Sequence, residues 1–486
     1  MGWVRRVVMW LAWCAAVAAS INLLLIARAP PTSYPHHHHQ HTTIISTTPA
    51  HDPAAQKIYL RGEIYATRDR FNIDNCSSKY LEKICSGVNS EYHKRNEHNR
   101  SGLQMLRSLY ALLPAVKTQY TSISPHLKEM VSNMKRDITL RRVTDDPWEW
   151  AHKWASPRSL VPDSARGLGD VLAALSTAPI VAADVGYKGT QLKITVMLKG
   201  GQRAVFKPKW YARDEIIEGE VYAGADRHNG EIAAFHLGRL LGFPMVPLAV
   251  GRKVSLKRQI LPVASKKLAA TFFTKRGRLC FYGVCYYCHK DSSVCDNGHN
   301  LEGTIIHWLP QQLPLMHLPH PWARTYKRTK MAQWEENENY CELVLRHSPF
   351  SDDNSPRLLD LMDTAVFDFL IQNGDRHHYT VVSGKHDSAI ILLDNGKSFG
   401  DADIDHMDIL APVLQCCRLR QTTYERLVLL SGGGLSQAMQ ELMSQDPLTP
   451  ILTKSHLLAL DRRVIHILAA LSMCREQHGG WHNVLY

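Results

Sequence analysis

Residues 375–396 read DRHHYTVVSGKHDSAIILLDNG and place an aspartate towards each end of one short segment. Asp375 follows 358–372, where apolar residues recur at three- and four-residue steps and predict a helix. Asp394 follows the apolar run 389–393, which predicts a strand. Either aspartate alone is ordinary turn chemistry. Two carboxylates on either side of a short strand could also act together in catalysis.

A hairpin is predicted upstream of this segment. Apolar residues alternate with others at Leu192, Ile194, Val196 and Leu198, as they do in a half-buried strand. Gly200-Gly201 predicts the turn, and a partner strand follows around Phe206. Lys207 lies in that second strand, where a lysine either extends its ammonium to water or meets an anion.

The next predicted element is a helix over 227–241 that ends at Gly242. Asp226 and Glu231 flank its start. Acidic residues at this position are ordinarily caps or partners of the helix dipole. Because they are too far apart in sequence to share one helical face, one could pair with Lys207 while the other reaches a metal.

Phosphoryl transfer needs a cation on the phosphates, carboxylates that hold a divalent metal and a carboxylate beside the attacking hydroxyl. Lys207 is a candidate for the cation, and Asp375 and Asp394 resemble the base and metal ligand of a kinase catalytic loop. A small β-rich region followed by helices at 358–372 and 457–474 is the α+β layout that a kinase uses.

Composition is that of a globular protein, with 486 residues, 45% hydrophobic and 21% charged. The net charge of +12 suggests an acidic partner, such as an anionic membrane or a polyanionic glycan. We expect no nucleic-acid partner, because the chain has neither zinc-finger spacing nor an RNA-binding signature.

The N-terminus predicts a membrane anchor. Residues 7–27 form an apolar run long enough for one helical crossing of a ~30 Å hydrocarbon core. Arg5 and Arg6 precede it and favour a cytoplasmic tail over 1–6, with the rest of the chain in the lumen. A cleaved signal peptide is the alternative, because 16–20 offers small residues that resemble a cleavage site.

The number of cysteines is consistent with a protein of the secretory pathway. Ten lie beyond the anchor, and an even number in an oxidising lumen suggests disulfides: Cys76, Cys85, Cys280, Cys285, Cys288, Cys295, Cys341, Cys416, Cys417 and Cys474. The four within 280–295 could instead hold zinc. Asn75 and Asn99 begin glycosylation sequons.

Composition also divides the chain. Residues 28–55, rich in His, Pro and Thr, predict a flexible stem. An accessory lumenal segment over 56–147 follows, helical around 103–116. The catalytic domain is expected over 148–486, with a stapled loop at 280–300.

Several linked motifs resemble the secretory-pathway kinases, a family that includes the Golgi casein kinase and a glycosaminoglycan xylosylkinase. They are DVGYKGTQLK (184–193), VFKP (205–208), DRHN (226–229), EIAAFH (231–236), DRHHY (375–379) and LDNGKSFG (393–400). The resemblance implies an atypical two-lobed kinase fold with a small β-rich N-lobe, a larger helical C-lobe and disulfide staples. It also implies ATP and manganese, with magnesium as an alternative.

Carried over by position, Gln191 and Lys207 would contact ATP, with Lys193 beside them. Asp226 and Asp394 would hold the metal. Glu231 would support them, Asp375 would be the base, and the adenine pocket would be lined by Ile306, His307, Trp308 and Leu309. Thr380 would also face the nucleotide, at a position where the family usually carries Glu.

The family pattern also implies four disulfides: Cys280–Cys295, Cys285–Cys288, Cys341–Cys416 and Cys417–Cys474. Cys76 and Cys85 would be an extra pair.

Two stretches, 184–193 and 393–400, together with Asp rather than Glu at 226, are more similar to the xylosylkinase than to the casein kinase. The expected activity is phosphorylation of the 2-hydroxyl of xylose in the proteoglycan linker, by a single-pass type II protein of the Golgi membrane. A secreted-protein Ser/Thr kinase is one alternative. A catalytically silent partner is the other, and Thr380 is the residue that favours it.

Overall fold

The computed structural model describes residues 56–60, 63–67, 91–139, 141, 146–186, 189–327, 330–351 and 356–486. Four features predicted from the sequence fall outside the described residues: the anchor 7–27, the stem 28–55, the sequon at Asn75 and the pair Cys76 and Cys85. The side chain of Asn99 lies outside them too. Within the described ranges, no helix is both long enough and apolar enough to span a membrane.

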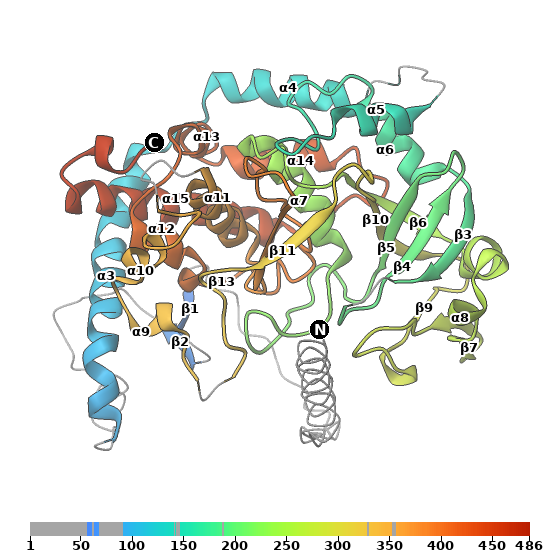
Figure 1. Cartoon of the computed structure of the whole chain (residues 1–486), viewed down its shortest axis with the longest axis horizontal. Coiled ribbons are helices and arrows are strands. Elements are labelled where there is room, and N and C mark those ends of the chain that lie inside the picture. The colour runs from blue at the N-terminus through green and yellow to red at the C-terminus, as the bar shows by residue number, and fades with distance from the viewer. Residues whose placement is uncertain are drawn as a thin grey trace, which may run out of the picture. The chain divides into compact units, whose positions relative to one another are not determined.

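A five-stranded antiparallel sheet, in the order β3-β4-β5-β10-β6, forms one side of the fold (Figure 1). Its strands are β3 (Ile180–Val185), β4 (Ile194–Leu198), β5 (Arg203–Pro208), β6 (Ala249–Val254) and β10 (Leu301–His307). The predicted hairpin is confirmed, because β4 pairs with β5 across the turn at Gly200-Gly201. Leu192, Ile194, Val196 and Leu198 are all buried, as their alternation predicts.

Helix α7 (His228–Leu241) lies between the sheet and the helical part of the molecule. It begins and ends almost where the sequence predicts, and Gly242 closes it in a left-handed conformation with φ of 73°. Every residue of α7 is buried, because the sheet covers one side and other helices cover the rest. The helix therefore presents its first turn to the interior of the fold rather than to solvent.

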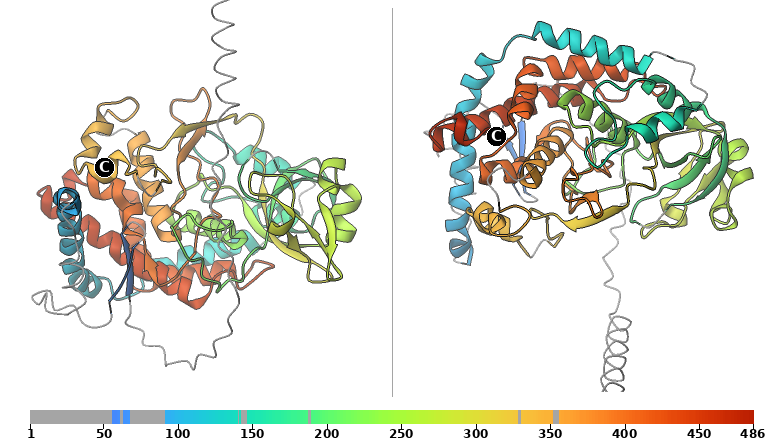
Figure 2. Two further views of the ribbon diagram at one scale, coloured as in Figure 1. Left: turned by 90° about the horizontal axis from the view of Figure 1, so that it is seen from below. Right: turned by 45° about the horizontal axis from the view of Figure 1, so that its top comes forward.

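The other side of the fold is helical, as Figure 2 shows. The helices predicted over 358–372 and 457–474 are α11 (Pro356–Ile371) and α15 (Lys454–Gln477), and three more lie with them: α12 (Ala411–Cys416), α13 (Gln421–Leu429) and α14 (Gly434–Met443). The helix predicted around 103–116 is part of α3 (Glu91–Gln119), which packs against α15. The following α4 (Pro125–Thr139) packs against α14.

Shorter elements connect these layers. The helices among them are α5 (Pro147–Trp154), α6 (Leu168–Thr177), α8 (Lys266–Ala269), α9 (Gln333–Glu336) and α10 (Tyr340–Leu345). The strands are β1 (Gln56–Leu60), β2 (Glu63–Thr67), β7 (Phe272–Lys275), β8 (Arg278–Phe281), β9 (Val294–Cys295), β11 (Leu315–Pro319), β12 (His378–Val382) and β13 (Ile404–Asp405). Strands β7, β8 and β9 form the small sheet of the stapled excursion, and β11 pairs with β12.

The strand predicted over 389–393 is wrong. Ile391 alone makes a bridge, with Thr380 of β12. The flanking amides bond to separate loops instead: Ala389 N donates to Pro157 O at 2.9 Å, and Leu392 N donates to Met245 O at 3.1 Å. The run is apolar because it is buried, and its backbone finds partners on several segments rather than along one strand.

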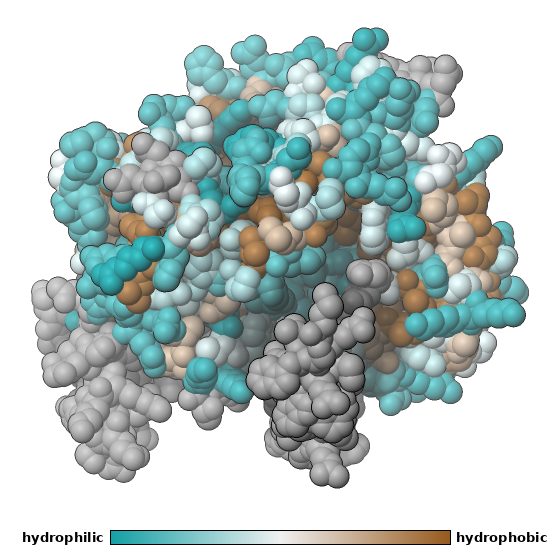
Figure 3. All heavy atoms as spheres, viewed as in Figure 1, coloured by the Kyte–Doolittle hydropathy of each residue, from teal (hydrophilic) through white to brown (hydrophobic). Residues whose placement is uncertain are grey.

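One hydrophobic core runs through the sheet, α7 and the helices. Outside it, the face drawn in Figure 3 mixes hydrophilic side chains with separate hydrophobic patches. A few charged residues are buried with this hydrophobic core. They need explanation, since a charge is costly to bury without a partner. Lys207, Asp226 and Glu231 are such residues, each no more than 5% exposed.

Candidate active site

Lys207 lies at the centre of a group of charges. The lysine comes from β5, and its side chain is only 7% exposed. Its Nζ lies 2.8 Å from Asp226 Oδ2, 2.7 Å from Glu231 Oε1 and 2.5 Å from Asp394 Oδ1. Asp226 and Glu231 are buried, whereas the side chain of Asp394 is 68% exposed. We call these four residues the Lys207 cluster.

Three carboxylates around one ammonium leave an excess of negative charge in the Lys207 cluster. Burial would lower the pKa of Lys207, but attraction to its three partners raises it well above the ordinary value. Lys207 in turn holds the pKa of Asp394 below its usual range. Burial raises the pKa of Asp226 despite the lysine. The cluster is therefore suited to take up a further cation, which would relieve the repulsion between its carboxylates.

Both acidic residues at the start of α7 contact Lys207, where the sequence led us to expect one such pair. Asp226 lies in the loop before the helix, and Glu231 lies in its first turn. Arg227 is at the N-cap, and no side-chain hydrogen bond caps the helix. Glu231 also accepts hydrogen bonds from Asn395 N at 3.0 Å and Asn395 Nδ2 at 3.1 Å. It therefore fixes the segment that carries Asp394.

The backbone at Asp394 is held in a rare conformation. Its φ of 59° is left-handed, a region that costs a non-glycine residue free energy. Gly396, two residues on, lies so close to Asp226 that an added Cβ would come within 2.5 Å of its carboxyl carbon. The glycine thus permits the two aspartates to approach, and its carbonyl accepts a 2.7 Å hydrogen bond from Arg227 N.

Asp375 lies on the loop between α11 and β12, and Arg376 ties that loop to the segment of Asp394. The guanidinium forms a two-pronged pair with Asp368 of α11, at 2.9 and 2.7 Å. It also donates to Leu393 O, and to Asn395 Oδ1 at 2.9 Å. One partly buried arginine therefore links the two loops that carry Asp375 and Asp394.

Asp375 itself is less enclosed than Lys207, Asp226 and Glu231, with 27% of its side chain exposed. Tyr326 Oη donates a hydrogen bond to Asp375 Oδ1, and His377 Nδ1 lies 3.7 Å from the same oxygen. His377 Nδ1 also lies 2.8 Å from the backbone oxygen of Asp375, and these contacts with Asp375 raise the pKa of His377. Sequence reasoning missed Tyr326, because it lies in a loop far from Asp375 in the chain and carries no motif.

Of the expected nucleotide contacts, Lys193 lies near the Lys207 cluster: it precedes β4 and, after Lys207, lowers the pKa of Asp394. Gln191, two residues earlier in the chain, is half-buried. Ile306 and His307 end β10, which pairs with β5, and Trp308 and Leu309 follow that strand. The His307 ring is buried against Trp148 and His152, and the Trp308 ring stacks under Arg203.

Thr380 is buried in β12, and its side chain pairs with a histidine. Its Oγ1 lies 2.9 Å from Nδ1 of His317, the residue opposite it in β11. Its carbonyl accepts a hydrogen bond from Ile391 N. The family's glutamate would bring a charge to this position, whereas threonine brings a hydroxyl that the histidine satisfies.

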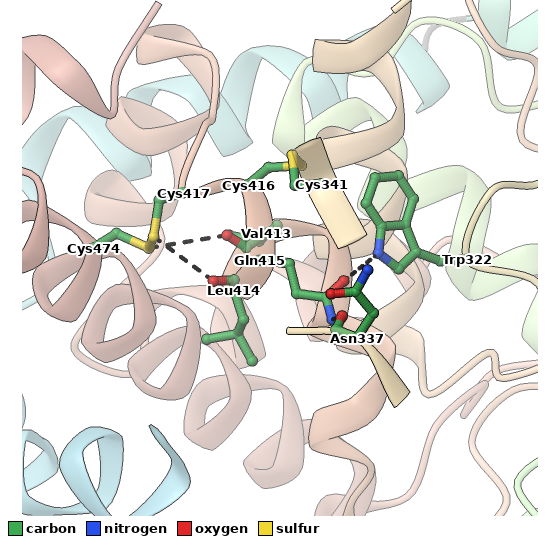
Figure 4. Close-up of a disulfide and its surroundings, with 9 residues drawn as sticks. All are labelled: Trp322, Asn337, Cys341, Val413, Leu414, Gln415, Cys416, Cys417 and Cys474. Atoms are coloured by element: carbon green, nitrogen blue, oxygen red, sulfur yellow. Dashed lines mark hydrogen bonds between the residues drawn. A yellow bond between two sulfur atoms is a disulfide. The ribbon is translucent and has the colours of Figure 1, made fainter. Parts of the chain in front are cut away.

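Four disulfides join the cysteine pairs that the resemblance implies: Cys280–Cys295, Cys285–Cys288, Cys341–Cys416 and Cys417–Cys474. The zinc alternative is wrong, because the four cysteines within 280–295 are bonded to each other as disulfides. Figure 4 shows how the adjacent Cys416 and Cys417 hold two partners, Cys341 and Cys474. Gln415, next to them, accepts a 2.7 Å hydrogen bond from Trp322 Nε1.

The Lys207 cluster fits a hard divalent cation in its chemistry. In the described part of the chain, no three His, Cys, Asp or Glu side chains form a ready metal cage. Asp226 and Asp394 nevertheless supply carboxylate oxygens, which manganese and magnesium prefer. The exposed carboxylate of Asp394 is accessible to an incoming ion, and the excess negative charge favours one.

Comparisons with known proteins identify relatives of this chain. The family described as "Fam20C: Golgi casein kinase, C-terminal, Fam20" matches residues 146–483. The human protein named glycosaminoglycan xylosylkinase is 49% identical over 346 residues, which cover 71% of this chain and 83% of that protein.

Solved structures show the same fold. A Fam20 structure from hydra, described as holding sugar, is 47% identical, with a TM-score of 0.68 over 71% of this chain and 99% of the other. The Golgi casein kinase structure with Mn and ADP bound is 32% identical, with a TM-score of 0.66 over 77% of this chain and 90% of the other. The fold is thus the α+β kinase-like fold of these proteins.

Proposed function

The chain belongs to the Fam20 family, and we propose that it transfers the γ-phosphate of ATP to the 2-hydroxyl of xylose in the linker between a glycosaminoglycan and its core protein. The observation that carries the proposal is the convergence of Asp226, Glu231 and Asp394 on Lys207, with Asp375 on the adjoining loop. The choice of acceptor rests on the similarity to glycosaminoglycan xylosylkinase.

Each group in the site has a role in this reaction. The xylose hydroxyl attacks the γ-phosphorus in line, and Asp375 accepts its proton. The new O–P bond forms as the bond to the β-phosphate oxygen breaks, and ADP leaves. Lys207 offsets negative charge on the phosphates, and Glu231 keeps both Lys207 and Asn395 in place.

Manganese, or magnesium in its place, would be held by Asp226 and Asp394 and would neutralise charge on the phosphates. Gln191 and Lys193 would contact the phosphate end of ATP. Residues 306–309 would line the adenine pocket, with Thr380 facing the nucleotide. Because threonine carries no charge, this side of the site carries less negative charge than a glutamate would give it.

The chain is proposed to work in the Golgi lumen, anchored by residues 7–27 as a type II protein. The tail 1–6 would be cytoplasmic, 28–55 would be the stem, 56–147 the accessory segment and 148–486 the two-lobed catalytic domain. Asn75 and Asn99 should carry glycans in this orientation. Glycosidase treatment of protein from eukaryotic cells checks this, and an unglycosylated chain that cytosolic protease digests would contradict it.

Labelled ATP distinguishes the proposal from its alternatives. The purified protein is incubated with manganese and either a linker tetrasaccharide, the same tetrasaccharide with 2-deoxyxylose, or casein. We expect label only on the intact tetrasaccharide. Label on casein alone would identify a protein kinase. Nucleotide binding without any transfer would identify a silent partner, the alternative that Thr380 favours.

A further inference from the structure

Tyr326 lies beside the proposed base in a strained and exposed position. Its φ of 56° is left-handed, which costs a bulky residue free energy. The residue is 40% exposed, although a large aromatic residue ordinarily buries most of its surface. Strain at an exposed residue indicates that something other than core packing holds it in place.

The contacts of Tyr326 are with Asp375 and its neighbours. Its hydroxyl donates to Asp375 Oδ1 and lies 3.2 Å from His377 Nδ1. Its ring meets the rings of Tyr222 and His377 edge-on, with centroids 4.7 and 5.9 Å away. The segment around Tyr222 also packs on the Asp375 loop, because a Cβ added to Gly374 would come within 2.2 Å of Val221.

The two oxygens of the Asp375 carboxylate differ in consequence. Oδ1 accepts from Tyr326 and faces His377. No residue in the described ranges donates a hydrogen bond to Oδ2. Burial and the nearby Asp375 raise the pKa of Tyr326, so its hydroxyl remains a proton donor across the physiological range.

We propose that Tyr326 is a positioning residue for the reaction: its hydroxyl holds Oδ1 of Asp375 so that Oδ2 is turned to the acceptor hydroxyl. The inference rests on the proposed role of Asp375 as the base. The proton of the acceptor passes to Oδ2 as the O–P bond forms, and Tyr326 keeps its own proton throughout.

Tyr326→Phe removes the hydroxyl and keeps the ring. We expect kcat to fall roughly 10- to 100-fold, the equivalent of losing a hydrogen bond to a charged group, while KM for ATP stays unchanged. The acid limb of the pH dependence of kcat should move to higher pH in this variant, because the carboxylate loses the hydrogen bond that Tyr326 donates. Other groups that act on this site are unchanged in the variant: Tyr222, Arg324, His377, His378 and Asp394.

Tyr340→Phe is the matched control, since its hydroxyl donates to Pro321 O at 2.9 Å, away from Asp375. It should change neither kcat nor the acid limb. Equal kcat and equal acid limbs for Tyr326→Phe and wild type would overturn the inference. A lower Tm for Tyr326→Phe than for Tyr340→Phe, with an unmoved acid limb, would assign the tyrosine to folding and overturn it too.

The ratio of kcat for Tyr326→Phe to kcat for wild type is measured with three acceptors. These are the xylosyl linker, casein and water, the last through ATP hydrolysis. The linker could fail as a substrate while kcat on casein or water falls in Tyr326→Phe and its acid limb shifts. That result would contradict the proposed acceptor and support the role of Tyr326. An unchanged ratio on the acceptor that the wild type uses would contradict the role of Tyr326 alone.

Discussion

Lys207 and Asp375 lie in neighbouring parts of the site and differ in how completely protein encloses them. Lys207 meets three carboxylates within 2.8 Å and is nearly inaccessible to solvent. Asp375 lies on a loop, a quarter exposed, with one tyrosine on one of its oxygens. Ion pairs therefore hold Lys207, the phosphate-binding group, in place before any ligand binds. The proposed base, Asp375, remains partly exposed to an acceptor.

Asp394→Ala breaks the Lys207 cluster and should have the largest effect. The variant lacks the only solvent-exposed carboxylate of the Lys207 cluster, so manganese-dependent ATP binding and transfer should both be lost. Calorimetric titration of ATP with manganese measures the first. Asp387→Ala, an exposed aspartate in the same segment, is the control and should bind as wild type does. Retained binding in Asp394→Ala would show that the metal ligand lies elsewhere.

Arg376→Ala breaks the link between the two regions. It leaves Asp368 buried without its arginine, and burial already raises the pKa of that carboxyl. We expect the free energy of unfolding to fall by about 3–5 kcal/mol, the cost of breaking a buried ion pair. Urea denaturation measures it. Arg158→Ala removes an exposed arginine and should stay within about 0.5 kcal/mol of wild type. A similar small loss at Arg376 would mean that the loops are held together by other contacts.

Thr380→Glu is expected to have the smallest effect of these substitutions. It adds a negative charge beside His317 and should leave transfer unchanged or raise it, because manganese affinity would be equal or higher. The test is the manganese dependence of transfer. Thr380→Val, which removes the hydroxyl without adding charge, is the control. If wild type binds ATP without transfer and Thr380→Glu alone restores transfer, the chain is a silent partner in its native form.

The elements predicted most accurately are those with strong periodicity. Apolar alternation located β4, and helical spacing located α7 and α11 to within about two residues. The apolar run 389–393 misled for a physical reason: burial makes a segment apolar whether or not its backbone joins a sheet. Ile391 bonds to β12, while its neighbours bond to other loops.

Residues of the site were predictable where a motif carried them. Lys207, Asp226, Glu231 and Asp394 were chosen from sequence, and they meet at one point. Their convergence depends on tertiary contacts that no local pattern encodes, such as the close approach of Gly396 to Asp226. Tyr326 could not be found in this way, because only the fold brings its loop to Asp375.

Asp375→Ala tests the central claim most directly, since it removes the base and leaves the Lys207 cluster intact. Manganese-dependent ATP affinity and phosphate transfer to the xylosyl linker are measured on this variant and on wild type. The account predicts unchanged ATP affinity and a turnover lower by roughly 10²–10⁴, the usual contribution of positioned acid–base catalysis. Full turnover in Asp375→Ala would contradict the account, because proton transfer would then not pass through this carboxylate.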